Sequence, residues 1–335
     1  MRVFKNFALA AVAALGVSAV SPAQAMVDRS LCVFDIIGAS GDIYSIMRDL
    51  KTEAAGWGVN LHLKPYTDEK IAAEDLKADQ CDGAVLTGLR VRQFNSFAGS
   101  MEAIGAIPTY EELRTVMRVL ASEAPSITEK MKSGSYTMGG MVPMGAAYLF
   151  VKDKEIDTVG ELSGKSISVM EYDPAQAQMA SKVGMSPVLS DITNFAGRFN
   201  NNSVDICFAP VVAYSALELY KGMQPDGGII RYTLGMLTTQ IVLQADRFPE
   251  GFDLKSRQFM LGQFDRAMTV IENAEREVDD KWWIEIPEQD KLRYDEMLRE
   301  ARIEMTNDGI YNADLVDLLK KVRCKYDASR AECTL

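Results

Sequence analysis

The sequence contains a single histidine, His62. Catalysis by a serine–histidine–aspartate or cysteine–histidine group would have to depend on that residue. His62 lies in the stretch NLHLKP, where strand alternation puts it on the polar side, so we predict a solvated histidine. No G-x-S-x-G motif is present. A hydrolase that uses paired carboxylates is the weakest remaining alternative, because abundant Asp and Glu are usually only solvated surface groups.

Cysteine is also limited, and no two cysteines form a C-x-x-C pair. With one histidine in the chain, we therefore expect no zinc site, and we expect no cofactor. Cys324 and Cys333 are close enough in sequence to close a small loop as a disulfide. Cys32 and Cys81 each begin a predicted strand, and their sulfur atoms meet if these strands are neighbours. Cys207 is left over, and we expect it to pack as a small apolar side chain.

Long apolar runs are absent after the N-terminus. Residues 1–25 have a basic start, an apolar run and the sequence Ala23-Gln24-Ala25, which predict a cleaved export signal; an uncleaved anchor is the alternative. Removal of this segment leaves 310 residues with 34 basic and 47 acidic side chains, a formal charge of −13. This acidic balance argues against nucleic acid and anionic membranes as partners. We expect a soluble exported protein, in keeping with a bacterial periplasm, with two lobes.

The order of the predicted elements indicates an α/β fold. Residues 31–38, 60–66 and 83–88 read as strands separated by helices, which predicts a parallel sheet. Residues 164–172 and 204–210 read as a second strand set, and 229–244 as a long strand-rich return. Residues 76–88 and 198–210 share one pattern, a polar turn and an Asp before a buried strand. We therefore predict two lobes, one formed by residues 26–145 with 235–335 and the other by residues 146–234. We expect mixed but mainly parallel sheets and a helical C-terminal region. The ligand should lie at the carboxyl ends of the strands.

The stretch GASGD, residues 38–42, follows the first strand. It lacks the Lys-Ser/Thr of a phosphate-binding loop and is not G-x-G-x-x-G. Asp35 and Asp42 would also repel an anion at the start of the next helix. We interpret the loop as one wall of a pocket for a polar or partly cationic solute, with Asp35 and Ser40 nearest to it. The alternative is a tight turn in which Asp42 caps the helix.

The stretch MEYDP ends the first strand of the second set. This strand end carries two acids and an aromatic side chain, Glu171, Tyr172 and Asp173, which could bind an amine or hydroxyl groups. Together with Asp35 they predict a pocket for a cationic or polyhydroxy solute. The alternative is a helix start with Asp173 as cap and Pro174 as first helical residue.

Longer stretches carry a family resemblance. IDTVGELSGKSISVMEYDP and KVGMSPVLSDITNFAGRFNNNSVDICFAP resemble the second lobe of TRAP-type transporter solute-binding proteins of the DctP class. Nearly the whole mature chain resembles a divergent subgroup of solute-binding proteins related to these receptors, through GDIY, WIEIP, RYDEM and KVRCKYDASRAEC. Some members of that subgroup carry an efflux-pump or aminoglycoside-resistance label. The resemblance implies a periplasmic binding protein-like fold of two lobes joined by crossing strands. It also implies a monomer that clamps a small-molecule solute and presents it to membrane permease subunits, without covalent chemistry.

The chain departs from that family at the usual carboxylate clamp. Ser168 stands where TRAP receptors usually have an arginine, and Phe208 with its neighbours replaces a usually polar strand end. Arg90, Arg92 and Arg198 are the arginines that could compensate; a solvated loop position is the alternative for Arg90 and Arg92. The full predicted ligand set is Asp35, Ser40, Arg90, Ser168, Glu171, Tyr172, Asp173, Phe195, Arg198 and Phe208. An accessory envelope or efflux-associated protein without solute capture is the alternative function, favoured by the apolar replacements.

Overall fold

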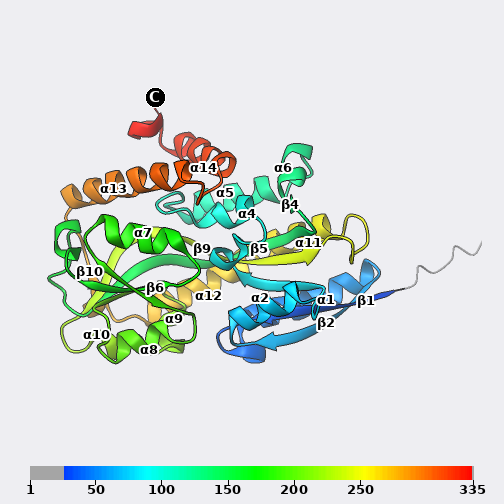
Figure 1. Ribbon diagram of the computed structural model, residues 1–335, viewed down its shortest axis with the longest axis horizontal. Coiled ribbons are helices and arrows are strands. Elements are labelled where there is room, and N and C mark those ends of the chain that lie inside the picture. The colour runs from blue at the N-terminus through cyan, green and yellow to red at the C-terminus, as the bar shows by residue number, and fades with distance from the viewer. Residues whose placement is uncertain (1–25, 334–335) are drawn as a thin grey trace, which may run out of the picture.

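The computed structural model describes residues 26–333, and the predicted export signal lies outside them (Figure 1). Ten strands form one continuous mixed sheet in the order β2-β1-β3-β9-β5-β8-β6-β7, with β10 beside β9 and β4 beside β5. The strands are β1 Val27–Phe34, β2 Val59–Tyr66, β3 Gly83–Thr87, β4 Lys132–Ser133, β5 Tyr136–Val151, β6 Ser166–Met170, β7 Ser186–Ser190, β8 Ile206–Pro210, β9 Gly228–Gln244 and β10 Trp283–Ile284.

Two parallel strand sets occupy the two ends of this sheet. In the first set β1 pairs in parallel with β2 and β3, and in the second set β6 pairs in parallel with β7 and β8. All five residues of β3 are buried, as expected for a parallel strand covered on both faces. The predicted α/β class is confirmed, and the two ends belong to one sheet rather than to separate sheets.

Two long antiparallel strands, β5 and β9, connect the sets. Strand β3 pairs with β9, and β8 pairs with β5. The register of β5 against β9 shifts next to Gly140 and Gly145, whose φ angles are +116° and +111°. A side chain at Gly140 would also lie 2.8 Å from Met260. Glycine therefore lets β5 bend at these bulges while it continues through both halves of the sheet.

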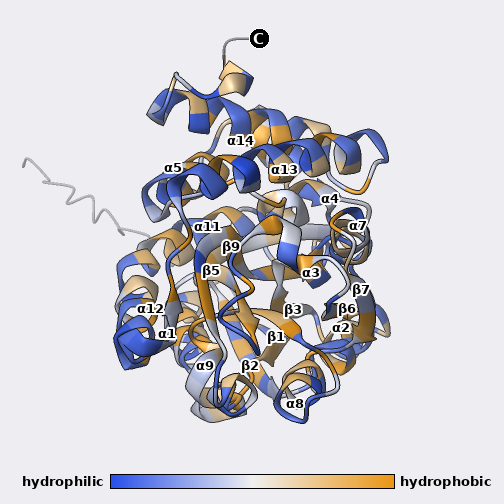
Figure 2. Cartoon of the chain, turned by 90° about the vertical axis from the view of Figure 1, so that its left-hand side faces the viewer, coloured by the Kyte–Doolittle hydropathy of each residue, from blue (hydrophilic) through white to orange (hydrophobic). Residues whose placement is uncertain are grey.

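Helices cover both faces of the sheet (Figure 2). On one face, α1 Asp42–Gly56, α11 Phe252–Gly262 and α12 Phe264–Glu277 pack on the apolar side chains of β1, β5 and β9. On the other face of the first set lie α2 Glu69–Lys77, α5 Tyr110–Leu120 and α14 Ala313–Tyr326. The second set packs against α7 Pro174–Lys182 and α13 Glu288–Asn307 on one face, and against α8 Phe195–Asn200, α9 Ala213–Ala216 and α10 Tyr220–Met223 on the other. The remaining α-helices are α3 Gly88–Val91, α4 Ser96–Gly99 and α6 Pro125–Lys130. No helix within residues 26–333 is long and apolar enough to cross a membrane.

Both predicted disulfides are present. Cys32 of β1 bonds to Cys81, which lies shortly before the neighbouring strand β3, and Cys324 bonds to Cys333. Cys207 is free and buried, as expected.

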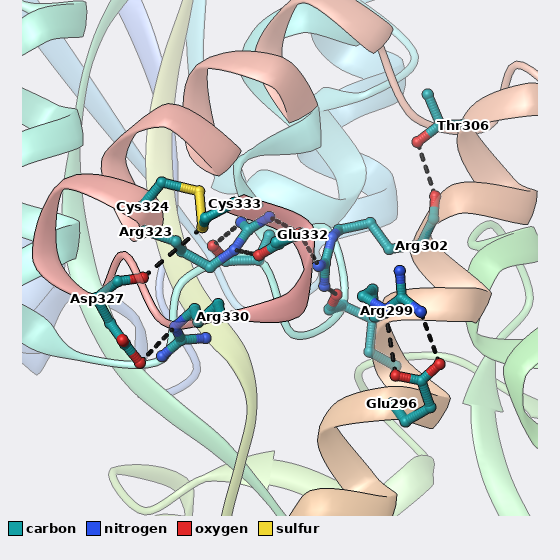
Figure 3. A network of polar contacts seen from close by, with 12 residues as sticks. Glu296, Arg299, Arg302, Thr306, Arg323, Cys324, Asp327, Arg330, Glu332 and Cys333 are labelled. Atoms are coloured by element: carbon teal, nitrogen blue, oxygen red, sulfur yellow. Dashed lines mark hydrogen bonds and ion pairs between the residues drawn. A yellow bond between two sulfur atoms is a disulfide. The ribbon is translucent and has the colours of Figure 1, made fainter. Parts of the chain in front are cut away.

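The second disulfide holds the C-terminal tail beside a charged network (Figure 3). Glu332 accepts hydrogen bonds from Arg323 Nε at 2.6 Å and from Arg302 Nη2 at 3.1 Å. Both arginines are buried and also donate to main-chain carbonyls, Arg302 to Ile104 and Arg323 to Ala106. The tail therefore fixes the loop at residues 104–106.

Candidate functional site

The carboxyl ends of the two parallel strand sets meet at a junction beside the crossing strands. The first set contributes the start of α2, which follows β2, and helix α3, which follows β3. The second set contributes the segment after β6. Three contacts join them: Lys70 Nζ to Glu171 Oε1 at 3.1 Å, Tyr172 Oη to Glu69 Oε2 at 3.1 Å, and Arg92 Nη1 to Asp173 Oδ1 at 2.6 Å. The structure thus brings predicted residues from both halves of the chain together.

We use the name junction group for Glu69, Arg90, Arg92, Tyr172 and Asp173. Within it, the Arg90 guanidinium lies 3.4 Å from the centre of the Tyr172 ring, a cation–π contact, and its Nε lies 3.5 Å from Glu69. Glu69 is fully buried and accepts the backbone N–H of Thr87 at 2.5 Å. Burial raises the pKa of the Glu69 carboxyl, opposed by the Thr87 hydrogen bonds and the charge of Arg90.

The junction group holds hydrogen-bond donors that the chain does not use. Arg90 Nε and Nη2 and Arg92 Nη2 are buried without a hydrogen-bond partner. Arg90 as a whole is 6 % exposed. A buried donor without an acceptor is costly, and a polar ligand at this position would remove that cost.

A second feature, here called the junction pocket, has about 720 Å³ of empty space, part of it open to solvent, and no member of the junction group is among its lining residues. Thr239, the strand partner of Thr87, lines it, and both halves of the chain contribute to its wall. The lining residues are Phe34, Asp35, Ile36, Ile37, Asp42, Ile43, Ile46, Pro143, Met144, Val212, Ala216, Thr239, Ala267, Val270 and Ile271.

Asp35 lines the junction pocket, but its carboxylate already serves the chain. It accepts the backbone N–H groups of Ile37, Ile43 and Tyr44 at 3.1, 3.1 and 3.2 Å. Burial raises the pKa of Asp35 against these hydrogen bonds. The prediction that Asp42 caps the helix is wrong: Gly41 is the N-cap residue, and the Asp35 carboxylate reaches the first amides of α1 from the strand. Ser40 is exposed on the preceding turn.

The predicted acids after β6 also have partners. Glu171 is paired with Lys70, and Asp173 with Arg92. Asp173 in addition caps α7 by accepting the Ala175 N–H at 3.1 Å, with Pro174 as the first helical residue, so the two predicted roles coincide. A cationic solute would have to displace Lys70 or Arg92 from these carboxylates.

The other predicted residues lie in different surroundings. Ser168 is buried on β6 and donates to Ser190 Oγ at 2.6 Å. Phe195 belongs to the apolar core beneath α8, and Phe208 lines a separate apolar pocket beneath α7. Arg198 on α8 is half-buried, with Nε buried and without a partner. His62 is exposed and lies 2.9 Å from Asp28, as predicted for a solvated histidine.

The sequence interpretation missed Glu69 and Glu102. Glu69 lies in the first turn of a helix, where an acidic residue is ordinary, so the pattern carries no signal of its burial. Glu102 lies between short turns without hydrophobic periodicity, yet it is 6 % exposed and accepts hydrogen bonds from Thr238 N and Oγ1 at 2.6 and 2.9 Å. Burial raises the pKa of Glu102 to about 8, against these hydrogen bonds.

Comparison with known folds supports the expected architecture. A TRAP periplasmic solute-binding protein from Desulfovibrio salexigens with bound orotic acid has a TM-score of 0.74 at 12 % identity, over 89 % of this chain and 99 % of that one. One from Haemophilus influenzae with bound L-gulonate has a TM-score of 0.72 at 12 % identity, over 88 % and 99 %. One from Sulfurospirillum deleyianum with bound succinate has a TM-score of 0.66 at 12 % identity, over 89 % and 99 %.

Comparison of sequences identifies the family. The probable solute-binding protein AdeT1 of Acinetobacter baumannii is 42 % identical over 303 residues, which cover 90 % of this chain and 99 % of that protein. The probable solute-binding protein AdeT2 of the same organism is 29 % identical over 237 residues, covering 71 % and 99 %. The model of the family described as solute-binding protein AdeT 1/2 matches residues 52–335. The chain therefore belongs to the AdeT 1/2 family of solute-binding proteins and has the fold of TRAP periplasmic solute-binding proteins.

Proposed function

We propose that this chain is a periplasmic receptor that captures a small polar solute between two lobes and delivers it to a TRAP-like membrane permease. The lobes are residues 26–145 with 235–335 and residues 146–234, and residues 1–25 are the export signal that is removed. Strands β5 and β9 cross between the lobes and act as the hinge. The receptor works as a monomer and performs no covalent step.

The junction group is the observation that carries this proposal. It joins residues that follow β2 and β3 to residues that follow β6, so a molecule bound among them contacts both lobes only when the lobes are together. Such a solute favours the closed form, because it gains contacts that the open form lacks. Arg90 Nη2, which has no hydrogen-bond partner, provides the polar contact in place of the usual arginine, whose position Ser168 occupies.

A thermal-shift screen of residues 26–335 tests the proposal, with carboxylates, amino acids, polyamines, sugars and aminoglycosides as the panel. A solute at one hundred times its Kd should add about 2.7 kcal/mol of stability. Arg90→Ala should remove the shift of any hit, whereas Arg198→Ala, at the other candidate arginine, should preserve it. Circular dichroism checks that both variants fold. A full shift in folded Arg90→Ala would place the solute elsewhere.

The accessory function without solute capture has one observation in its favour. The chain's own side chains, Lys70 with Glu171 and Arg92 with Asp173, already link the two halves across the junction. Small-angle scattering separates the alternatives. A receptor should show a population of open molecules that contracts when a hit from the panel is added, whereas an accessory protein should keep one compact shape and give no hit.

A further inference from the structure

A second pocket lies between the second strand set and the helices α7 and α13, which run close to each other in Figure 1. It has about 760 Å³ of empty space, part of it open to solvent. Its wall is mainly aliphatic and thioether side chains from β5, β6, β8, β9, α7 and α13, among them Leu149, Val169, Met179, Ala180, Phe208 and Met297. We use the name α7–α13 pocket for it.

This pocket shares no lining residue with the junction pocket, although Asp173 of the junction group also lines it. Ile167 and Val169 of β6 line it, so strand alternation directs Ser168, which lies between them, to the opposite face of the sheet. The position at which the resemblance places the usual carboxylate-binding arginine therefore faces away from the α7–α13 pocket.

Three polar side chains at the α7–α13 pocket have an atom that the chain leaves without a hydrogen bond. They are Glu102 Oε2, Gln176 Nε2 and Tyr294 Oη, all buried. Glu102 is 6 % exposed and Tyr294 is 0 % exposed. Their other contacts hold them in place, since Gln176 Oε1 accepts the Met170 N–H at 2.8 Å and the Tyr294 ring lies 4.8 Å from that of Tyr232. Such an apolar wall with a few fixed polar atoms is the usual composition of a small-molecule site.

We propose that the α7–α13 pocket is a second ligand site, which takes a neutral, mainly apolar small molecule with one hydrogen-bonding group. This goes beyond the proposed receptor function and does not depend on it. The site selects the class of ligand by its charges. No Lys, Arg or His is among its lining residues in the described part of the chain, while Glu102 and Asp173 are, so an anion would be buried without a partner.

A cation is disfavoured for a different reason. Asp173 is already paired with Arg92 at 2.6 Å, and Glu102 is mainly protonated at neutral pH because burial raises its pKa to about 8. A neutral group can instead bond to the amide of Gln176, to the hydroxyl of Tyr294 or to the protonated carboxyl of Glu102. The rest of the ligand would replace empty space against the aliphatic wall.

The test uses N-phenyl-1-naphthylamine, a neutral dye that fluoresces in apolar surroundings, with residues 26–335. The wild type should bind it at one saturable site. Ala180→Phe, which fills the pocket from α7, should weaken binding at least tenfold, whereas Tyr172→Phe in the junction group should keep it within about twofold. No saturable binding to the wild type, unchanged binding to Ala180→Phe, or loss in Tyr172→Phe would each overturn the proposal.

Two further measurements keep the result decisive if Ala180→Phe does not fold. 1-Decanol should displace the dye at least ten times more effectively than decanoate or decylamine, and equal displacement by all three would refute the selection for neutral ligands. In crystals soaked with 1-bromonaphthalene, anomalous bromine density between α7 and α13 supports the site. Bromine density only elsewhere, or none, refutes it.

Discussion

Replacing Glu332 by glutamine should destabilise the protein strongly, because it removes the one carboxylate that Arg302 and Arg323 share in Figure 3. The Glu332 side chain is 13 % exposed, and those of the two arginines are 5 % and 1 % exposed. Both cations would then keep only main-chain carbonyls as partners. An unpaired buried charge costs more than the ion pair contributed.

The pKa of Glu332 gives the expected magnitude. Burial acts to raise this pKa, but the hydrogen bonds and charge of Arg323, together with the charge of Arg302, lower it from 4.5 to about 2. This difference corresponds to roughly 3 kcal/mol of stabilisation at neutral pH. With an unfolding entropy of about 2.1 cal/mol/K per residue, Tm should fall by about 5 °C. Because the folded-state pKa is lowered, this contribution is present above pH 4.5 and is lost as the pH falls toward 2.

Thermal unfolding of the wild type and Glu332→Gln between pH 7 and pH 2.5 measures both effects. Glu296→Gln is the matched control, because Glu296 pairs with Arg299 on the exposed side of the same network. This control should leave Tm nearly unchanged, since water solvates both partners. Equal losses of Tm in the two variants, or a Glu332→Gln deficit that stays constant down to pH 2.5, would refute the reasoning.

Four other changes have outcomes that follow from single contacts. Cys32→Ser with Cys81→Ser opens a link between residues 49 apart, and the urea midpoint should show a loss of about 4 kcal/mol on the chain-entropy estimate; an unchanged midpoint would contradict it. Gly41→Ala places a methyl group about 2.0 Å from the Asp35 carboxylate, so it should lower Tm at least as much as Asp35→Asn, and a harmless Gly41→Ala would disprove the capping role. The raised pKa of Glu102 means that the wild type loses stability relative to Glu102→Gln as the pH rises from 4.5 to about 8, which urea unfolding at several pH values measures. Arg92→Met and Asp173→Asn should each cost about 3–5 kcal/mol, and the double variant should cost clearly less than their sum; simple additivity would show that the pair is not coupled.

The parallel strand sets and both disulfides could be predicted because local patterns determine them. Cys32 and Cys81 each open a predicted strand, and they meet because β1 pairs with β3, a neighbour relation that the sequence left as a condition. The first half of β5 could not be recognised in the same way. Its Gly139, Gly140, Pro143 and Gly145 are turn and loop signals in a sequence, whereas in the structure they accommodate bulges against β9.

The candidate site was predicted in part, because a sequence shows which residues follow a strand but not which partners they find. Arg90, Tyr172 and Asp173 are brought together as their strand-end positions indicated. Glu171 and Asp173 are predicted to bind a solute because the sequence shows no partner for a carboxylate at a strand end. In the structure, distant residues such as Lys70 and Arg92 neutralise them. The role of Asp35 was missed for a different reason: the amides that it accepts lie nearby in the following loop and helix, but the cap was assigned to Asp42 at the start of that helix.

Asp173 connects the junction group with the α7–α13 pocket in one further respect. Its carboxylate holds Arg92 of the junction group, caps α7, and also lines the α7–α13 pocket. A molecule that shifts the start of α7 must therefore alter the contact between Asp173 and Arg92, and a solute that moves Arg92 must alter the start of α7. Binding at two such sites is reciprocal: if the dye weakens solute binding by some factor, the solute weakens dye binding by the same factor. In Asp173→Asn, which weakens this shared contact, the factor should approach one; an unchanged factor would mean that the two sites communicate by another route.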